Sequence, residues 1–219
     1  MPGIGNLSVD QLRQRILSFD RSYLDDWNAW LDVRRNQPDN IAMEFGRVLR
    51  RWQACRPNTM CRSRMDANYK GPYLDDLLSQ SQKALAHFDG FKLSNADAID
   101  QEIECTLTQL WKIFQYLSFS GRARNGLAGV VGISKAVLLL TDGRIGPAFD
   151  SEIRRKLRTG KIFTPAAWVA NLRNVAADIA EFERSNQCAL YEAVPREFAH
   201  LHYGRLYDMI LGPGTPELR

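Results

Sequence analysis

Apolar residues recur at steps of three and four along most of this chain of 219 residues. One run follows Ser8 and continues through Leu12, Ile16, Phe19, Tyr23, Trp27 and Trp30. This spacing places the apolar side chains on one face of a helix, and the alternation typical of a half-buried strand extends nowhere beyond four residues. The chain is therefore expected to be all-α, with about eight or nine helices.

Local signals predict where several helices begin. Ser8 with Gln11 forms a capping-box pattern, and Thr164 followed by Pro165 is typical of a helix start. Further helices are expected over about 41–52, 74–88, 95–117 and 196–211. The tryptophans on these stripes, Trp27, Trp30, Trp111 and Trp168, are predicted core residues rather than a stacking platform.

Composition limits the architecture and the kind of partner. With 45% apolar residues, the chain is long enough for one globular helical unit over 1–219, either a single large domain or two interlocked lobes. Basic residues gather in two segments, 50–70 and 122–161, on an otherwise nearly neutral background. This pattern favours a localised positive face and a polyanionic partner such as nucleic acid.

Other classes of site and location receive little support from the sequence. The four cysteines form no CxxC pair, and the three histidines complete no metal-ligand pattern, so no metal, cofactor or disulfide is expected. No apolar run reaches the length of a membrane span, and "MPGIGNLSVDQ" does not resemble a secretion signal. We therefore expect a cytoplasmic protein that does not enter a membrane.

The segment 121–160 carries the strongest functional pattern. "GRARNGLAGVVG" contains four glycines and leads into the apolar helix "ISKAVLLL", whose one charged residue is Lys135. A glycine turn before a helix exposes unpaired backbone amides, which bind phosphate oxygens together with the positive end of the helix dipole. The residues expected to contact phosphate are Gly129, Val131, Gly132 and Ser134, with the cations Arg122, Arg124, Arg154 and Arg155 beside them.

An acidic residue follows this helix in a well-defined setting. Asp150 precedes "SEIRRKL" and is the expected N-cap of that helix, with Ser151 as the alternative cap. A carboxylate at a helix N-terminus stays ionised and well placed, so Asp150 is a candidate for catalysis as well as for capping. A solvated surface face is an equal alternative for the basic residues around 154–158.

These residues resemble a known family. "LAGVVGISKA" is similar to the helix-hairpin-helix of the DNA glycosylase superfamily, L-P-G-[VI]-G-x-K-T-A, and "PAFDSEIRR" resembles its P-x-x-D-x-x-[VI]-x-R segment. "SKAVLLLTDGRIGPAFDSEIRR" and "RLYDMIL", with Arg205 and Asp208, are closer to a bacterial group with an 8-oxoguanine-glycosylase-like fold. The turn differs from the family pattern, because Lys135 lies three residues after Gly132 instead of two.

The resemblance implies a two-lobed glycosylase-like fold that binds double-stranded DNA and excises a damaged or modified base, with or without lyase activity. Asp150 would be the essential carboxylate. Lys135 would be the nucleophile, a phosphate ligand or a surface lysine, because one extra helical residue turns a side chain by about 100°. The alternative interpretation is a non-catalytic helical module that binds nucleic acid or a protein.

Overall fold

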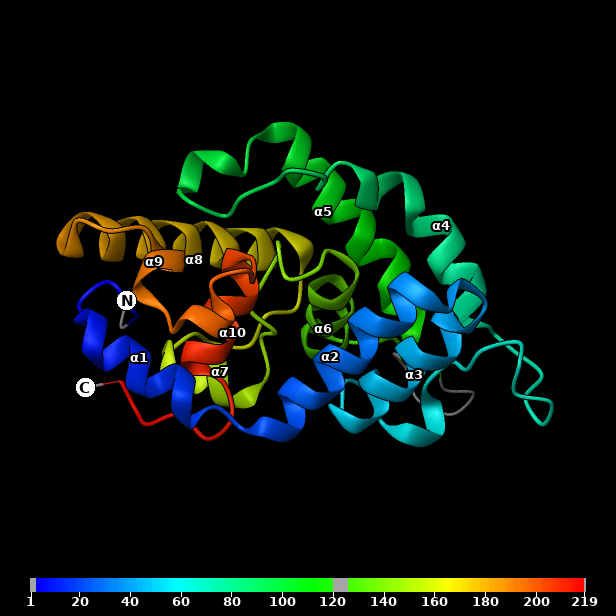
Figure 1. Ribbon diagram of the computed structural model, residues 1–219. Coiled ribbons are helices and arrows are strands. Elements are labelled where there is room, and N and C mark those ends of the chain that lie inside the picture. Colours follow the sequence, from blue (N-terminus) through cyan, green and yellow to red (C-terminus); the bar gives the residue numbers. More distant parts are fainter. Residues whose placement is uncertain (1–2, 120–125, 219) are drawn as a thin grey trace.

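The computed structural model describes residues 3–119 and 126–218. These residues form ten α-helices and no sheet, with two isolated β-bridges, which confirms the all-α expectation (Figure 1). In chain order the helices are α1 (Val9–Ser18), α2 (Arg21–Asn36), α3 (Ile41–Arg51), α4 (Leu74–Ala86), α5 (Gln101–Phe114), α6 (Val130–Leu140), α7 (Ser151–Lys156), α8 (Pro165–Asn186), α9 (Leu190–Ala193) and α10 (Tyr203–Leu211). None of the helices within the described ranges combines the length and the apolar character that a bilayer crossing needs.

The expected helix starts are present. Ser8 and Gln11 form a complete capping box at α1, and the Thr164 side chain accepts a hydrogen bond from Ala167 N before α8. Each cap supplies an acceptor for backbone amides that have no partner within the helix. These caps explain why the two boundaries could be predicted to the residue.

Three expected helices are interrupted or shorter. The first apolar stripe divides at Phe19, because Asp20 caps a new helix by accepting from Ser22 N. Asn95 caps only a short 3₁₀ turn, and α5 begins after Asp100, whose side chain accepts from Ile103 N. The last helix begins at Tyr203 rather than near 196, where only a short 3₁₀ turn forms.

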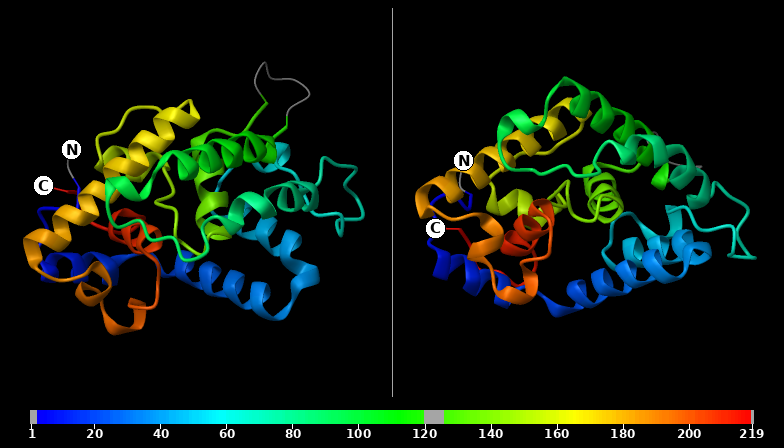
Figure 2. Two further views of the ribbon diagram at one scale, coloured as in Figure 1. Left: turned by 90° about the horizontal axis from the view of Figure 1, so that it is seen from above. Right: turned by 45° about the horizontal axis from the view of Figure 1, so that its top comes forward.

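Helix α6 lies in the middle of the molecule, between two groups of helices (Figures 1 and 2). The chain termini lie with α1, α8, α9 and α10, whereas α2, α3 and α4 lie on the other side. Every residue of α6 except Val131 is buried. A helix that is apolar on all sides needs such complete cover, and α3 and α5 provide part of it.

The predicted aromatic core is present. Trp27, Trp30, Trp111 and Trp168 are all buried, and the rings of Trp111 and Trp168 lie 5.9 Å apart across α5 and α8. Large buried aromatic rings dominate the apolar area removed from water in a domain of this size. These tryptophans therefore have structural positions, as expected.

Buried among these apolar groups is an ion pair. The Arg205 guanidinium is completely buried, donates to Asp208 Oδ2 at 2.7 Å and lies over the rings of Trp27, Trp52 and Phe19. Asp208 also accepts from the amide of Ala148 at 2.9 Å. The pair thereby connects α10 to α1, α2 and the segment before α7.

We predict that Arg205→Met destabilises the protein by about 3–5 kcal/mol, because it leaves the Asp208 carboxylate buried without its partner. The matched control is Arg184→Met, which removes an exposed pair to Glu181 at the same i,i+3 spacing. That control should leave the free energy of unfolding unchanged. Urea unfolding of both variants measures the difference, and equal losses would contradict this role for Arg205.

Candidate nucleic-acid interface and catalytic pair

The N-terminus of α6 presents backbone donors as the glycine pattern predicts. Gly129 is the N-cap, is exposed, and provides no side-chain acceptor. The amides of Val130, Val131 and Gly132 donate to no residue in the described ranges. Val130 and Gly132 are buried and Val131 is half-buried, so this helix end combines unpaired amide groups with the positive end of the helix dipole.

Gly132 has a packing role beside this helix end. A Cβ atom at Gly132 would lie 2.8 Å from Cys55 Sγ and 3.0 Å from the carbonyl oxygen of Ala54. The absence of a side chain therefore allows α6 to pack against the chain that follows α3. Gly129 differs, because a Cβ atom there would meet nothing within 4 Å.

Ser134 does not lie where a phosphate contact would need it. Its side chain is buried, donates to Val130 O at 2.7 Å and accepts from Phe149 N at 2.9 Å. The hydroxyl group therefore connects α6 to the segment before Asp150. This geometry corrects the expectation that Ser134 binds DNA directly.

Lys135 is buried, with 4% of the residue exposed, on the same central helix. Its ammonium group donates to the carbonyl oxygen of Trp52, just past the end of α3. The distance from Lys135 Nζ to Asp150 Oδ2 is 3.8 Å. Burial lowers the pKa of Lys135, while the carboxylates of Asp150 and Asp208 oppose that shift. The structure thus brings the two predicted catalytic residues together, with Lys135 buried and Asp150 half-buried.

Asp150 is held in place from two directions. Its Oδ1 accepts from the amides of Glu152 and Ile153, both at 3.0 Å, so it is the N-cap of α7 as predicted. Two residues earlier, the amide of Ala148 donates to Asp208. Asp150 Oδ2 remains directed toward Lys135, and 17% of the Asp150 side chain is exposed. The carboxylate is therefore both fixed and partly open to solvent.

Residues distant in sequence complete the surroundings of this pair. Tyr23 is half-buried, and its ring lies 5.7 Å from that of Trp52. Burial raises the pKa of Tyr23, and the Asp150 carboxylate raises it further. Burial also raises the pKa of the Cys55 thiol to about 12, so this cysteine stays protonated at neutral pH. In the sequence Tyr23 lies on an apolar stripe, and no local motif marks it as a neighbour of Asp150.

The basic cluster after Asp150 is largely used within the protein. Arg154 Nε donates to the carbonyl oxygens of Phe149 and Asp150, and Arg155 pairs with Glu217. Lys156 is buried and donates a hydrogen bond to Glu152, so its ammonium group does not face solvent. Of the two arginines predicted to bind DNA here, Arg155 is exposed and Arg154 is half-buried.

The other basic segment, residues 50–70, lies beside the chain that enters the hairpin. Cys61 N donates to Leu117 O at 2.9 Å, Phe119 N donates to Thr59 O at 2.7 Å, and Met60 forms an antiparallel bridge with Ser118. Residues 59–61 and 117–119 therefore run side by side. The chain after α3 also lies against the start of α6, because a Cβ atom at Gly132 would meet Cys55 and Ala54.

Half of the cations in residues 50–70 are neutralised by nearby acids. Arg51, Arg62 and Arg64 pair with Asp26, Asp66 and Asp76, respectively. Arg56 and Lys70 are exposed and make no ion pair with any residue in the described ranges. Arg122 and Arg124, which were also expected to contact DNA, lie outside the described residues.

Comparisons with known proteins identify no relative. No family model, no curated protein and no solved structure matches this chain. Within the described residues, all four cysteines are free thiols, and no group of three or more His, Cys, Asp or Glu side chains is arranged to hold a metal.

We predict that Ser134→Ala destabilises the protein by about 1–3 kcal/mol, because the buried amide of Phe149 loses its acceptor. Ser151→Ala is the control, since Ser151 is exposed on the first turn of α7. Thermal unfolding of both variants measures the effect. A stable Ser134→Ala variant with weakened DNA binding would instead restore the direct role that the sequence predicted for this hydroxyl group.

Proposed function

We propose that this protein binds double-stranded DNA through the start of α6 and excises a damaged or modified base at the Lys135–Asp150 pair. The observation that carries the proposal is the 3.8 Å separation of Lys135 Nζ and Asp150 Oδ2, because these residues lie fifteen positions apart on two different helices. The resemblance of the surrounding segment to DNA glycosylases predicts this pairing of a lysine with a carboxylate.

The pair has the properties that base excision requires. Breaking the bond between base and sugar develops positive charge on the sugar, and a fixed carboxylate such as Asp150 stabilises that charge. An amine attacks the sugar only when it is neutral, and the lowered pKa of Lys135 increases its neutral fraction at a given pH. Attack by Lys135 would form a covalent intermediate and add lyase activity.

DNA binding would use groups outside this pair. The amides at the start of α6 supply neutral donors for phosphate oxygens, and the exposed Arg56 and Lys70 of the segment 50–70 supply positive charge. The target base must leave the stack to reach a buried catalytic pair. A flipped nucleotide would have to approach past the half-buried Tyr23 and the exposed part of Asp150.

One observation favours the second candidate, a non-catalytic helical module that binds nucleic acid. Lys135 is nearly inaccessible and already donates to the carbonyl oxygen of Trp52. A nucleophilic role requires that this hydrogen bond break and that the ammonium group lose its proton. If neither occurs, Lys135 and Asp150 serve only to connect α6, α7 and the end of α3.

For catalysis, we predict covalent trapping by borohydride on duplexes that carry abasic sites or members of a panel of base lesions. Trapping should depend on Lys135 and disappear in Lys135→Gln. Its rate should rise with pH and level off below the ordinary lysine pKa of 10.5, because only the neutral amine reacts and burial lowers its pKa. Peptide mapping of the trapped product identifies the attacking residue.

Asp150→Asn is the informative second variant, because asparagine is as good an N-cap as aspartate and should preserve α7. Loss of the carboxylate should slow excision by about 10²-fold or more while the fold remains intact. Duplex binding by the wild-type protein without excision of any lesion or trapping at any pH would favour the non-catalytic module.

For binding, we predict that log Kd changes steeply with log salt, because phosphate contacts release counterions. The double variant Arg56→Gln, Lys70→Gln should reduce the slope by about 1.8. The charge-matched control is Arg184→Gln, Arg196→Gln, two exposed arginines near the end of α8 and after α9. Fluorescence anisotropy at several salt concentrations measures both slopes, and equal slopes would place the DNA elsewhere.

A further inference from the structure

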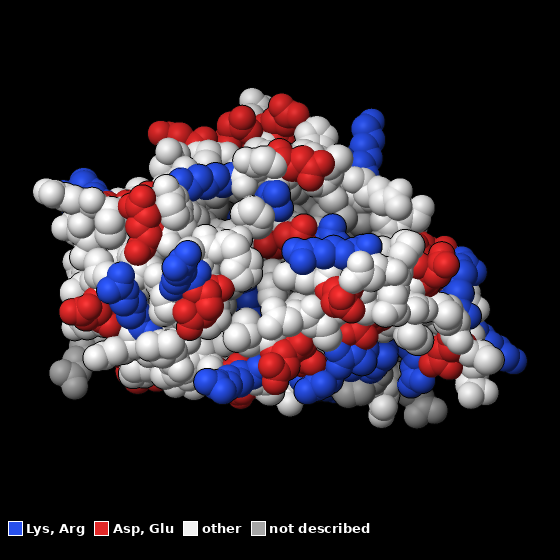
Figure 3. Space-filling model, in the orientation of Figure 1, with Lys and Arg blue, Asp and Glu red and all other residues white. Residues whose placement is uncertain are grey.

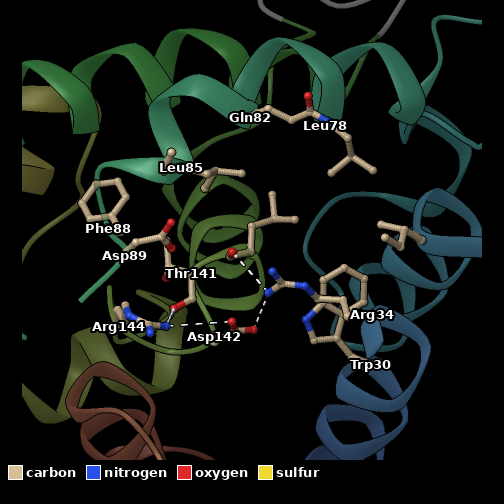
Figure 4. A pocket seen from close by; sticks show the side chains of 13 residues that line it. Trp30, Arg34, Leu78, Gln82, Leu85, Phe88, Asp89, Thr141, Asp142 and Arg144 are labelled. Carbon is tan, nitrogen blue, oxygen red and sulfur yellow. Dashed lines mark hydrogen bonds and ion pairs between the residues drawn. The ribbon is translucent and has the colours of Figure 1, made fainter. Parts of the chain in front are cut away.

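A cavity lined by both charged and apolar side chains lies at the end of α6 opposite the proposed DNA site. It has a volume of about 340 Å³ and opens between α2, α4 and the turn that follows α6. Figure 4 looks onto this end of α6, with Leu78, Gln82 and Leu85 of α4 on one side and Arg34, Asp142 and Arg144 on the other. This volume lies within the range of pockets that hold small organic molecules.

The cavity is separate from the catalytic pair. Neither Lys135 nor Asp150 lines it, and Leu140, which does, lies five residues after Lys135, about 7.5 Å along the helix axis. The buried side chains of Trp27 and Arg205 pack against Gly143 in the turn that follows α6. A ligand in this cavity would therefore not be a DNA base held by the start of α6.

Two arginines in the cavity share a single carboxylate. Arg34 Nη1 donates to Asp142 Oδ1 and to the carbonyl oxygen of Leu140, whereas Arg144 Nη1 reaches Asp142 Oδ2 only at 3.9 Å and Thr141 O at 3.5 Å. Asp142 contacts both arginines and Asp89 lies at the rim, so two guanidinium groups and two carboxylates leave the cavity formally neutral. Both guanidinium groups direct only Nη1 to these partners, so further donors remain for an acidic ligand.

Arg144 is the less satisfied of the two arginines. Its side chain is 21% exposed, and its buried Nε has no hydrogen-bond partner among the described residues. Buried donors without a partner are rare because they cost free energy. Arg144 also lines two neighbouring hollows on this face, which Figure 3 shows with basic and acidic side chains interspersed. An acceptor in the cavity would pair with Arg144 Nη2, which donates to no described residue and is not among the buried donors.

The wall of the cavity opposite the two arginines is apolar and determines which ligands fit beside the charged group. Ile41, Leu78 and Leu85 are half-buried, and Phe88 and Leu140 form buried surface behind them. A ligand that gains from this wall must carry an apolar group of similar size. A fully hydrated inorganic anion would leave this surface unused.

We propose that this cavity binds a small carboxylate with a branched or aromatic apolar body. The carboxylate lies between Arg34 and Arg144, where guanidinium groups form paired hydrogen bonds to it, and the apolar body lies against Leu78 and Leu85. Asp89, exposed at the rim, is placed to contact an ammonium group if the ligand is an amino acid. Ligands with and without an ammonium group would share the carboxylate and the apolar body.

The test is isothermal titration calorimetry of the full chain with three matched probes. These are 4-methylpentanoate, leucine and 3-methylbutylamine, which have the same branched body with a carboxylate, with both charged groups, or with an amine alone. We expect saturable binding of at least one carboxylate probe with Kd of about 1 mM or lower, and no binding of the amine. Preference for leucine over 4-methylpentanoate would assign a role to Asp89.

Arg144→Met should weaken binding about tenfold or more, because it removes a charge-assisted contact. Arg35→Met is the control, since Arg35 is the exposed neighbour of Arg34 and does not line this cavity. Leu85→Trp fills the apolar side and should abolish binding while leaving the arginines intact. Thermal unfolding confirms that each variant is folded. Absence of binding by both carboxylates, equal binding of the amine, or unchanged affinity in Arg144→Met and Leu85→Trp would overturn the proposal.

Discussion

The buried guanidinium group of Arg205 is the interaction on which the arrangement of this protein depends. It carries a charge within the apolar core, where an unpaired cation would be strongly unfavourable. Asp208 compensates that charge at 2.7 Å, the rings of Trp27 and Trp52 lie against the cation, and the carbonyl oxygen of Tyr23 accepts a further hydrogen bond. The chain must therefore bring α10, α2 and the end of α3 to one point.

The same contacts position the candidate catalytic pair. Trp52, which covers Arg205, supplies the carbonyl oxygen that accepts from Lys135. Asp208, which pairs with Arg205, also holds the amide of Ala148 two residues before Asp150. Ser134 adds a second connection, from α6 to Phe149. Trp52 and Asp208 therefore contact both the buried ion pair and the proposed site. Arg205 itself forms no hydrogen bond with Lys135 or Asp150.

The sequence predicted those features that depend on local chemistry. The caps at Ser8, Asp150 and Thr164 are side-chain contacts within three residues, so the residue order is enough to identify them. The burial of the tryptophans follows from helical spacing in the same way. The break at Asp20 was missed because the apolar spacing continues across it, while the side chain of Asp20 starts a new helix.

Features that depend on contacts between distant segments could not be predicted from the sequence. Ser134 looks like a phosphate ligand in its motif, yet its hydroxyl group is used by Phe149, fifteen residues later. Lys156 belongs to a basic run, yet it is buried against the carbonyl oxygens of Gly212 and Thr215. The cavity at the other end of α6 combines residues from α2, α4 and the turn at 141–144, and no short motif contains them.

The central claim is that DNA contacts the start of α6, close to Lys135 and Asp150. Amide hydrogen exchange tests it directly, by comparison of the protein alone with the protein on a duplex that carries a stable abasic-site analogue. The account predicts slower exchange at Val130, Val131 and Gly132, whose amides have no acceptor among the described residues, and in the loop around Arg56 and Lys70. Unchanged exchange at these amides under saturating DNA, with protection confined to other surfaces, would contradict it.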